Sequence, residues 1–256
     1  MHNKSLRIIV TRPEKQGREL VKTLKQNGFE AISTPFFDYK KNASIETYQQ
    51  LLAQQPDIII FVSVAAVTFA NKALPLKEWP KATWVAVGKA TSKKLQSCGI
   101  ENVISPTLQN SEGVLLLREL QQLNQKSIVI VRGESGREHM AQQLNVRGAK
   151  VQYLEAYQRH WFELTQATIK QWQQQDINCI TITSNDLLES VVQLINNQAD
   201  SNYQDFWKTK HLWIVASKRI ANHALTLGIK RVVCSAGASD EAILTALRNM
   251  EQDHDR

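Results

Sequence analysis

The side chains best suited to chemistry in this sequence follow apolar runs that have the composition of buried strands. Ligands of open parallel sheets bind beyond the carboxyl ends of the strands, where loops and helix N-termini converge. Acids are scarce at these ends, and hydroxyls, glycine and cations are common: Thr11, Arg12, Ser63, Gly88, Lys89, Arg132, Ser184, Ser217 and Lys218. Hydroxyls, backbone amides and cations bind anions, so this set predicts an anion-binding site.

Two further arginines, Arg18 and Arg137, lie in the first turn of predicted helices, where a cation opposes the helix dipole. This placement favours side chains that reach outward, and we expect Arg137 to join the anion site. Purely structural roles stay open for several members of the set: Ser63 and Ser184 as helix N-caps, Arg12 and Arg132 as solvated loop residues.

One motif occurs twice, at residues 8–20 and 128–140. Each copy reads as a buried strand that ends in an arginine, a turn through Pro or Gly, and a helix that opens with Gly-Arg-Glu. Four more pairs of similar blocks follow in the same order: 57–63 with 179–184, 83–91 with 211–219, 95–100 with 225–229, and 111–116 with 239–244. Five matched blocks predict an internal duplication.

Strand and helix patterns alternate along both copies, which predicts an α/β fold with parallel sheets. The run at 57–62 is almost continuously apolar, as expected of a central strand covered on both faces. Helices are expected at 14–27, 44–54, 64–73, 111–123, 135–147 and 164–174, and further strands at 6–11, 29–34, 83–87, 102–104, 128–131, 151–157 and 179–183.

Composition narrows the class of protein. The 256 residues are 43% hydrophobic, enough for a large core. The three cysteines (Cys98, Cys179, Cys234) are an odd number without Cys-x-x-Cys spacing, so we expect a reducing compartment and neither disulfides nor zinc. No apolar run approaches the roughly eighteen residues of a membrane span, and no signal-peptide segment is seen, so we expect a cytoplasmic protein without membrane contact.

The formal net charge of +7 suits an anionic partner. The basic residues are scattered and not interleaved with aromatics, so nucleic acid is not expected. The chain has no Gly-x-Gly-x-x-Gly, no phosphate-binding loop and no nucleophile elbow, and its six histidines have no metal-ligand spacing. An enzyme built from this sequence is expected to work without a cofactor, a metal or a covalent intermediate.

The ordered blocks resemble those of the uroporphyrinogen-III synthases across nearly the whole chain. The matching pieces are Val10-Thr11-Arg12-Pro13 with Gly17, 60–63 with Ala66-Val67, 85–91, Ser111-Glu112-Gly113, 154–159, Ile182-Thr183-Ser184 and Ser239-Asp240-Glu241. Each piece is weakly specific alone, whereas the ordered set is specific.

The resemblance implies two similar parallel-sheet α/β domains joined by a two-stranded connector. The first domain would combine residues 1–36 with 163–256, the second would span 41–154, and the connector would be 36–40 with 155–162. Sequence repetition alone would equally allow two tandem domains.

The resemblance also implies a monomeric, cofactor-free lyase of haem biosynthesis. Its substrate would be the linear tetrapyrrole hydroxymethylbilane, which carries eight carboxylates and is closed with loss of water and inversion of the last ring. Tyr157 matches the family's candidate acid. A phenol is protonated at neutral pH and can donate to a leaving hydroxyl, and the alternative is a tyrosine that packs at a domain junction. The second copy departs from the family's frequent Gly-Pro-Thr-Thr and has Ser217-Lys218-Arg219-Ile220 in its place. Ile220 has no hydroxyl, so Ser217 or Lys218 would substitute for the hydroxyl of the family.

Two other classes of protein stay open at this point. A non-catalytic two-lobed receptor for a small polyanion would bind the substrate without converting it. A nucleic-acid-binding protein would show steep salt dependence and a continuous basic face.

Overall fold

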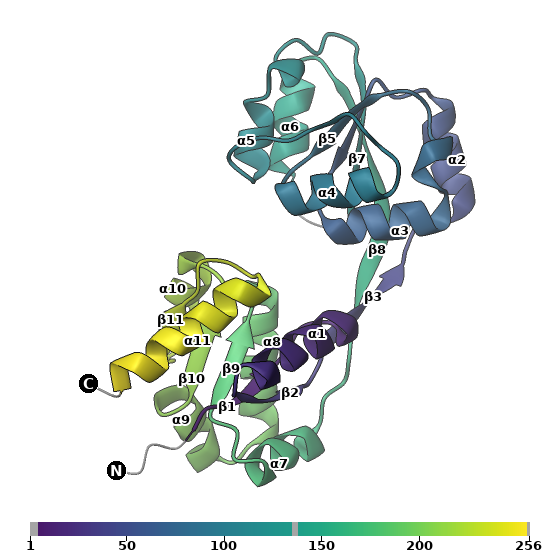
Figure 1. The fold of residues 1–256 in the computed structure, drawn as a ribbon. Helices are drawn as coiled ribbons and strands as arrows, with labels where there is room; N and C mark the ends of the chain where they lie inside the picture. The colour runs from purple at the N-terminus through teal and green to yellow at the C-terminus, as the bar shows by residue number, and fades with distance from the viewer. Residues whose placement is uncertain (1–4, 135–137, 255–256) are drawn as a thin grey trace. The chain divides into compact units, whose positions relative to one another are not determined.

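The computed structural model describes residues 5–134 and 138–254, with side chains as far as residue 250. The chain divides into two compact units (Figure 1): unit 1 is Met1–Asp38 with His160–Arg256, and unit 2 is Tyr39–Arg159. Each unit is built on its own sheet with helices on both faces, so the predicted α/β class with parallel sheets is confirmed. Among the described helices, none combines the length and apolar character needed to cross a bilayer.

The sheet of unit 1 has the order β11-β10-β9-β1-β2, and every pairing in it is parallel. Its strands are β1 (Arg7–Val10), β2 (Glu30–Ser33), β9 (Cys179–Ile182), β10 (Leu212–Val215) and β11 (Val232–Cys234). Because Ile8 lies opposite Cys179, the two ends of the chain share one sheet, as tandem domains would not.

Helices cover both faces of this sheet, as apolar strands buried on both sides require. The helices are α1 (Glu14–Gln26), α7 (Gln166–Gln174), α8 (Asn185–Gln198), α9 (Ser201–Thr209), α10 (Lys218–Thr226) and α11 (Asp240–His254). On one face, Leu20 of α1 and Ile243 of α11 pack with Ile8 of β1 in a single buried cluster.

The sheet of unit 2 has the order β3-β8-β7-β4-β5-β6. Its strands are β3 (Phe37–Lys41), β4 (Ile58–Phe61), β5 (Thr83–Ala86), β6 (Val103–Ile104), β7 (Ser127–Gly133) and β8 (Lys150–Trp161). The two passages of the chain between the units fall within β3 and β8. Without β3, this order equals the order of unit 1 read from β2 to β11. In it β7, β4 and β5 take the places of β1, β9 and β10, the strands of the matched blocks, which agrees with the predicted duplication.

The central strand β4 shows why its sequence is continuously apolar. Ile59 and Phe61 face a core with α2 (Ile45–Ala53), α3 (Val64–Ala73) and α4 (Lys89–Ser97). Ile58 and Ile60 face the other core, with α5 (Ser111–Leu115) and α6 (His139–Val146). All four side chains are buried, so no polar alternation is possible.

The helix expected at 111–123 is wrong in its length, because α5 ends at Leu115 and only the short 3-10 turn η2 (Arg118–Leu120) follows. The carbonyl of Leu115 accepts hydrogen bonds from Arg147 Nη1 at 2.7 Å and Gln121 Nε2 at 2.9 Å. Side chains therefore satisfy the carbonyl that another helical turn would have used. Leu116, the first residue after α5, is 76% exposed.

Candidate functional site

Unit 2 carries the predicted hydroxyl and amide groups at one edge of its sheet. Ser63 follows β4 and caps α3, its Oγ accepting the Ala66 N–H at 3.0 Å. Gly88 follows the neighbouring strand β5 and begins α4 without a side-chain cap. There the backbone N–H of Lys89 donates to Gln109 Oε1 at 2.9 Å. Two adjacent helix N-termini thus point their amides at this edge, as an anion site requires.

Tyr157 reaches this edge because of a bulge between β7 and β8. The register places Arg132 opposite Glu155 but Gly133 opposite Tyr157, so β8 carries one extra residue, Ala156. The backbone N–H of Glu134 donates to the Tyr157 carbonyl at 2.6 Å and closes the bulge. Bulges redirect side chains and are common beside functional sites.

The Tyr157 ring lies in an aromatic setting and directs its hydroxyl at Ser63. The Tyr39 ring meets it edge-on, with centroids 5.0 Å apart, and the Phe69 ring lies 5.7 Å away. Tyr157 Oη is 3.2 Å from Ser63 Oγ, within hydrogen-bonding distance. The structure therefore joins two residues that the sequence separates by 94 positions.

The contact between these hydroxyls has a chemical consequence. Ser63 Oγ already accepts the Ala66 N–H, and its own proton is available to donate to Tyr157 Oη. In that arrangement the phenol proton points to a third group, such as a ligand. A hydrogen bond from Ser63 would also stabilise the phenolate left after proton transfer.

Arg132 does not have the solvated position expected of a ligand-binding cation, because it is only 7% exposed. Nη1 contacts Glu138 at 3.0 Å, Nη2 contacts Glu155 at 3.3 Å, and the guanidinium lies 3.9 Å from the centre of the Tyr153 ring. The Tyr153 hydroxyl donates to Glu138 at 2.6 Å. Two carboxylates therefore neutralise Arg132 within the protein.

The pKa shifts of Tyr153 and Glu138 follow from burial and from their hydrogen bonds beside Arg132. Burial, followed by the hydrogen bond to Glu138, raises the pKa of Tyr153 to about 12. The hydrogen bonds from Tyr153 and then Arg132 hold the pKa of Glu138 below its usual range. Tyr153 thus stays protonated and Glu138 stays ionised across the neutral range.

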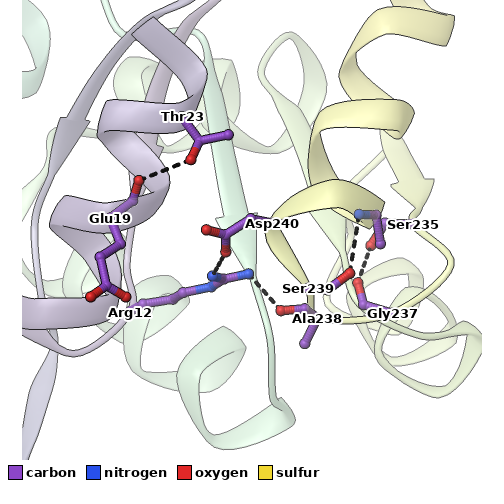
Figure 2. Close-up of polar contacts among 9 residues, drawn as sticks. Arg12, Glu19, Thr23, Ser235, Gly237, Ala238, Ser239 and Asp240 are labelled. Carbon is purple, nitrogen blue, oxygen red and sulfur yellow. Dashed lines mark hydrogen bonds and ion pairs between the residues drawn. The ribbon is translucent and has the colours of Figure 1, made fainter. Parts of the chain in front are cut away.

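Arg12, the matching arginine of unit 1, is 8% exposed and is also paired internally. Figure 2 shows its guanidinium between α1 and the loop that precedes α11. Nη1 donates to the Asp240 carboxylate, and Nη2 donates to the Ala238 carbonyl at 2.6 Å. The loop has its own support, since Ser235 Oγ donates to the Gly237 carbonyl at 2.8 Å. Arg12 therefore anchors this loop, and its burial contradicts the solvated position that the sequence left open.

Thr11 is fully buried, and its hydroxyl donates to the Thr181 carbonyl at 2.6 Å. Its side chain has no exposed surface through which it could touch a ligand in this structure. The expectation for Thr11 came from its place at a strand end, but the hydroxyl serves the pairing of β1 with β9 instead.

The remaining predicted residues of unit 1 lie where two neighbouring strands end. Ser184 follows β9 and caps α8, with Oγ accepting the Leu187 N–H at 3.2 Å. Ser217 follows β10 and caps α10, with Oγ accepting the Ile220 N–H at 3.4 Å. Lys218, like Lys89 in unit 2, is exposed in the first turn of its helix. Arg137 lies outside the described residues.

Several residues at these sites were not predicted as site residues: Tyr39, Phe69, Gln109, Gly133 and Asp240. Tyr39 lies in the expected connector 36–40 and Phe69 in the middle of the expected helix 64–73, and neither position indicates a place at the site. The other three act through contacts between distant segments. Within the described residues, no group of three or more His, Cys, Asp and Glu side chains could hold a metal ion.

The sequence of the chain matches a known family of proteins. A family model described as "Uroporphyrinogen-III synthase HemD" matches residues 18–245. The chain is 30% identical over 250 residues to the uroporphyrinogen-III synthase of Escherichia coli (strain K12), covering 94% of this chain and 99% of that protein. The chain belongs to the uroporphyrinogen-III synthase family. The uroporphyrinogen-III synthase of Salmonella typhimurium is also 30% identical over 250 residues.

Solved uroporphyrinogen-III synthases have the same fold. A structure of the Thermus thermophilus protein superposes with a TM-score of 0.62, covers 97% of this chain and 98% of its own, and is 13% identical. A structure of the Helicobacter pylori protein has a TM-score of 0.62, covers 96% and 99%, and is also 13% identical. At such identities the likeness concerns the fold.

Membership in the uroporphyrinogen-III synthase family also decides between an enzyme and the two other classes of protein that the sequence left open. The family consists of cofactor-free cyclising enzymes of tetrapyrrole biosynthesis, whereas those alternatives were a receptor for a small anion and a nucleic-acid-binding protein.

Proposed function

We propose that this chain cyclises hydroxymethylbilane with loss of water and inversion of the terminal pyrrole ring, and that Tyr157 is the proton donor. The contact of Tyr157 Oη with Ser63 Oγ, at 3.2 Å beside the α3 N-terminus, carries the proposal for the site. Family membership supports the reaction, and the contact supports the assignment of roles within it.

In the first step, the bond between the hydroxymethyl carbon and its oxygen breaks. Tyr157 gives its proton to the departing hydroxyl, which leaves as water, and the pyrrole nitrogen stabilises the resulting cation as an azafulvene. The substituted carbon of the terminal ring then attacks to form a spiro intermediate, which rearranges to the inverted ring. The proton released when that pyrrole regains aromaticity replaces the one that Tyr157 supplied.

The protein's further task is to hold a flexible, eight-armed acid in the reactive conformation. In unit 2 the proposed carboxylate contacts are the Gly88 and Lys89 amides, beside Ser63, whose hydroxyl proton is given to Tyr157, and in unit 1 they are Ser184, Ser217 and Lys218. Displacement of Gln109 from the Lys89 amide would open one of these positions. Six to eight contacts of about 1 kcal/mol each would give roughly micromolar affinity without a dominant anchor.

Arg12 and Arg132 take no part in this proposed binding set. Each is almost fully buried and paired with carboxylates of the protein, so it offers little charge to a substrate. Lys89 and Lys218, exposed at helix N-termini, are better placed. We expect Lys89→Ala or Lys218→Ala to raise KM about five- to tenfold with little effect on kcat, because each removes one contact of about 1 kcal/mol.

The test uses the linear substrate, with chromatography separating the two cyclic isomers. Tyr157→Phe is expected to lower kcat for the inverted isomer by about 10²- to 10⁴-fold, the usual worth of general acid catalysis. Ser63→Ala is expected to cost about tenfold, since one hydrogen bond to the acid is lost. Tyr48→Phe is the matched control, because Tyr48 is a buried tyrosine of the same unit whose hydroxyl has no hydrogen-bond partner among the described residues.

Three outcomes would count against the proposal. Wild-type turnover in Tyr157→Phe would remove the assigned acid, and complete loss in Ser63→Ala with an intact fold would contradict diffuse recognition. Saturable binding of the linear substrate without conversion would indicate a receptor. The proposed working form is a cytoplasmic monomer acting on a small molecule, and light scattering coupled to gel filtration tests its oligomeric state.

A further inference from the structure

The Tyr157 ring occupies the space in which a side chain at position 133 would lie. A Cβ atom built on Gly133 would be 2.8 Å from both Cε2 and Cζ of the Tyr157 ring and 3.2 Å from its hydroxyl oxygen. Contacts below about 3 Å are not tolerated between carbon atoms, so the ring can pack this closely only against glycine.

The backbone of Gly133 does not itself require glycine. The glycines with positive φ among the described residues are Gly28, Gly99, Gly148, Gly228 and Gly237. Gly133 has a conformation open to any L-residue, so the absence of a side chain there serves Tyr157 and not the turn.

The ring has little freedom to move away from a new side chain. Tyr39 and Phe69 pack against it, and its hydroxyl lies on Ser63. A methyl group at position 133 must therefore either shift the hydroxyl from Ser63 or separate β8 from β7.

The bulge that presents Tyr157 is held from both sides. Before it, Arg132 on β7 pairs with Glu155 on β8 at 3.3 Å, and after it Glu134 N–H binds the Tyr157 carbonyl at 2.6 Å. Glu138 and the Tyr153 ring fix the guanidinium of Arg132. Arg132 thus sets the register from which Tyr157 projects.

We propose that Gly133 and Arg132 are positioning residues that place the Tyr157 hydroxyl for the reaction. This inference rests on the proposed role of Tyr157. If Arg132 positions Tyr157, its substitution lowers kcat. If Arg132 binds a substrate anion, its substitution raises KM.

The main test is Gly133→Ala in the full chain. We expect kcat to fall at least about tenfold with KM changed less than about threefold, because displacement of a catalytic group affects the transition state and not substrate affinity. Gly17→Ala is the matched control. A Cβ there would also be crowded, at 2.5 Å from Ser33 Oγ, but it lies in unit 1 and φ is not positive. It should keep the parent kcat.

Two further measurements separate positioning from general damage. In a Tyr157→Phe background, Gly133→Ala should cost less than about twofold more, because both changes act through one hydroxyl. In protein labelled with ¹³Cζ-tyrosine, the resonance absent from Tyr157→Phe identifies Tyr157, and Gly133→Ala should shift it. Arg132→Lys, which keeps the charge but cannot span both glutamates, should shift the same resonance and lower kcat about three- to tenfold.

The outcomes are distinguishable. An unshifted Tyr157 resonance in both variants, or an equal loss from Gly133→Ala with and without the phenol, overturns the positioning role. A rise in KM alone for Arg132→Lys overturns it for Arg132. If Tyr157→Phe turns over normally while Gly133→Ala still shifts the resonance, the proposed acid fails and the geometric inference stands.

Discussion

Replacement of Arg12 by alanine distinguishes a structural role for this side chain from a role in binding the substrate. The Arg12 side chain is 9% exposed, and its two terminal nitrogens contact the Asp240 carboxylate and the Ala238 carbonyl. Hydrogen bonds involving a charged group contribute about 1.5–3 kcal/mol each when buried. The Asp240 side chain is 38% exposed, so solvent screening reduces the share of the ion pair. We therefore expect Arg12→Ala to lower the free energy of unfolding by about 2–3 kcal/mol.

Urea denaturation and calorimetry measure this effect, which corresponds to a fall in Tm of roughly 5–10 °C for a unit of this size. Arg18→Ala is the matched control, because Arg18 is 71% exposed and its ion pair among the described residues is with Glu14 of the same helix, α1. That variant should lose less than about 0.5 kcal/mol. Arg12→Lys should fall between them, since lysine can satisfy one acceptor but lacks the guanidinium fork.

A double-mutant cycle of Arg12→Ala with Asp240→Ala isolates the pair, and we expect a coupling energy of about 1 kcal/mol. Below the transition temperature, Arg12→Ala should keep KM within about twofold of the parent, because the guanidinium is engaged within the protein. An unfolding free energy equal to that of the parent, together with a tenfold rise in KM, would refute the structural role and indicate that Arg12 binds the substrate.

Three further predictions concern buried or paired titratable and polar groups. Burial raises the pKa of Tyr48 to about 12, above the unfolded value of 10.0. The contribution of the neutral phenol to the free energy of unfolding is therefore complete below pH 10 and is lost as the pH rises to about 12. In urea unfolding, the stability of Tyr48→Phe should fall less steeply with pH in this range, and the same pH dependence as the parent would contradict this. The hydrogen bonds from Lys126 and the Ser127 N–H lower the pKa of Asp57 from 3.8. The contribution of the ionised carboxylate to the free energy of unfolding is therefore present above that value and is lost as the pH falls through the lower folded pKa. In acid unfolding, Asp57→Asn should lack this part of the loss of stability. His211 places its ring nitrogens 2.7 Å from the Ile177 carbonyl and 3.3 Å from the Phe206 carbonyl, so His211→Leu should cost about 1–3 kcal/mol in thermal unfolding and His211→Gln less, with equal losses arguing for packing alone.

The sequence was most informative where the physics is local. Ser63, Ser184 and Ser217 cap their helices through the N–H three residues later, a contact determined within one turn. The apolar run of β4 predicts burial on both faces, because any solvent-facing side would need polar residues. Repetition added information that single elements lack, since matched blocks predict matched sheets.

The sequence was least informative where contacts join distant segments. Arg12 and Asp240 are 228 positions apart, and no local pattern indicates that the loop before α11 returns to the end of β1. Thr11 illustrates the same limit. A hydroxyl at a strand end is expected to be free to bind a ligand, but the pairing with β9 brings it to the Thr181 carbonyl, to which it donates a hydrogen bond. The bulge at Tyr157 likewise depends on a register that periodicity cannot specify.

One difference between the two motif copies accounts for the unequal chemistry proposed for the two units. After its arginine, the first copy has Pro13, which lacks the N–H needed to continue a ladder, and β1 ends at Val10. The second copy has Gly133, and β7 continues through Arg132 to Gly133. Only the longer strand can pair beyond the arginine, form the bulge with β8 and leave room for an aromatic ring. The two units thus share the strand ends at which anion binding is proposed, and glycine in place of proline leaves room for the Tyr157 ring in unit 2 alone.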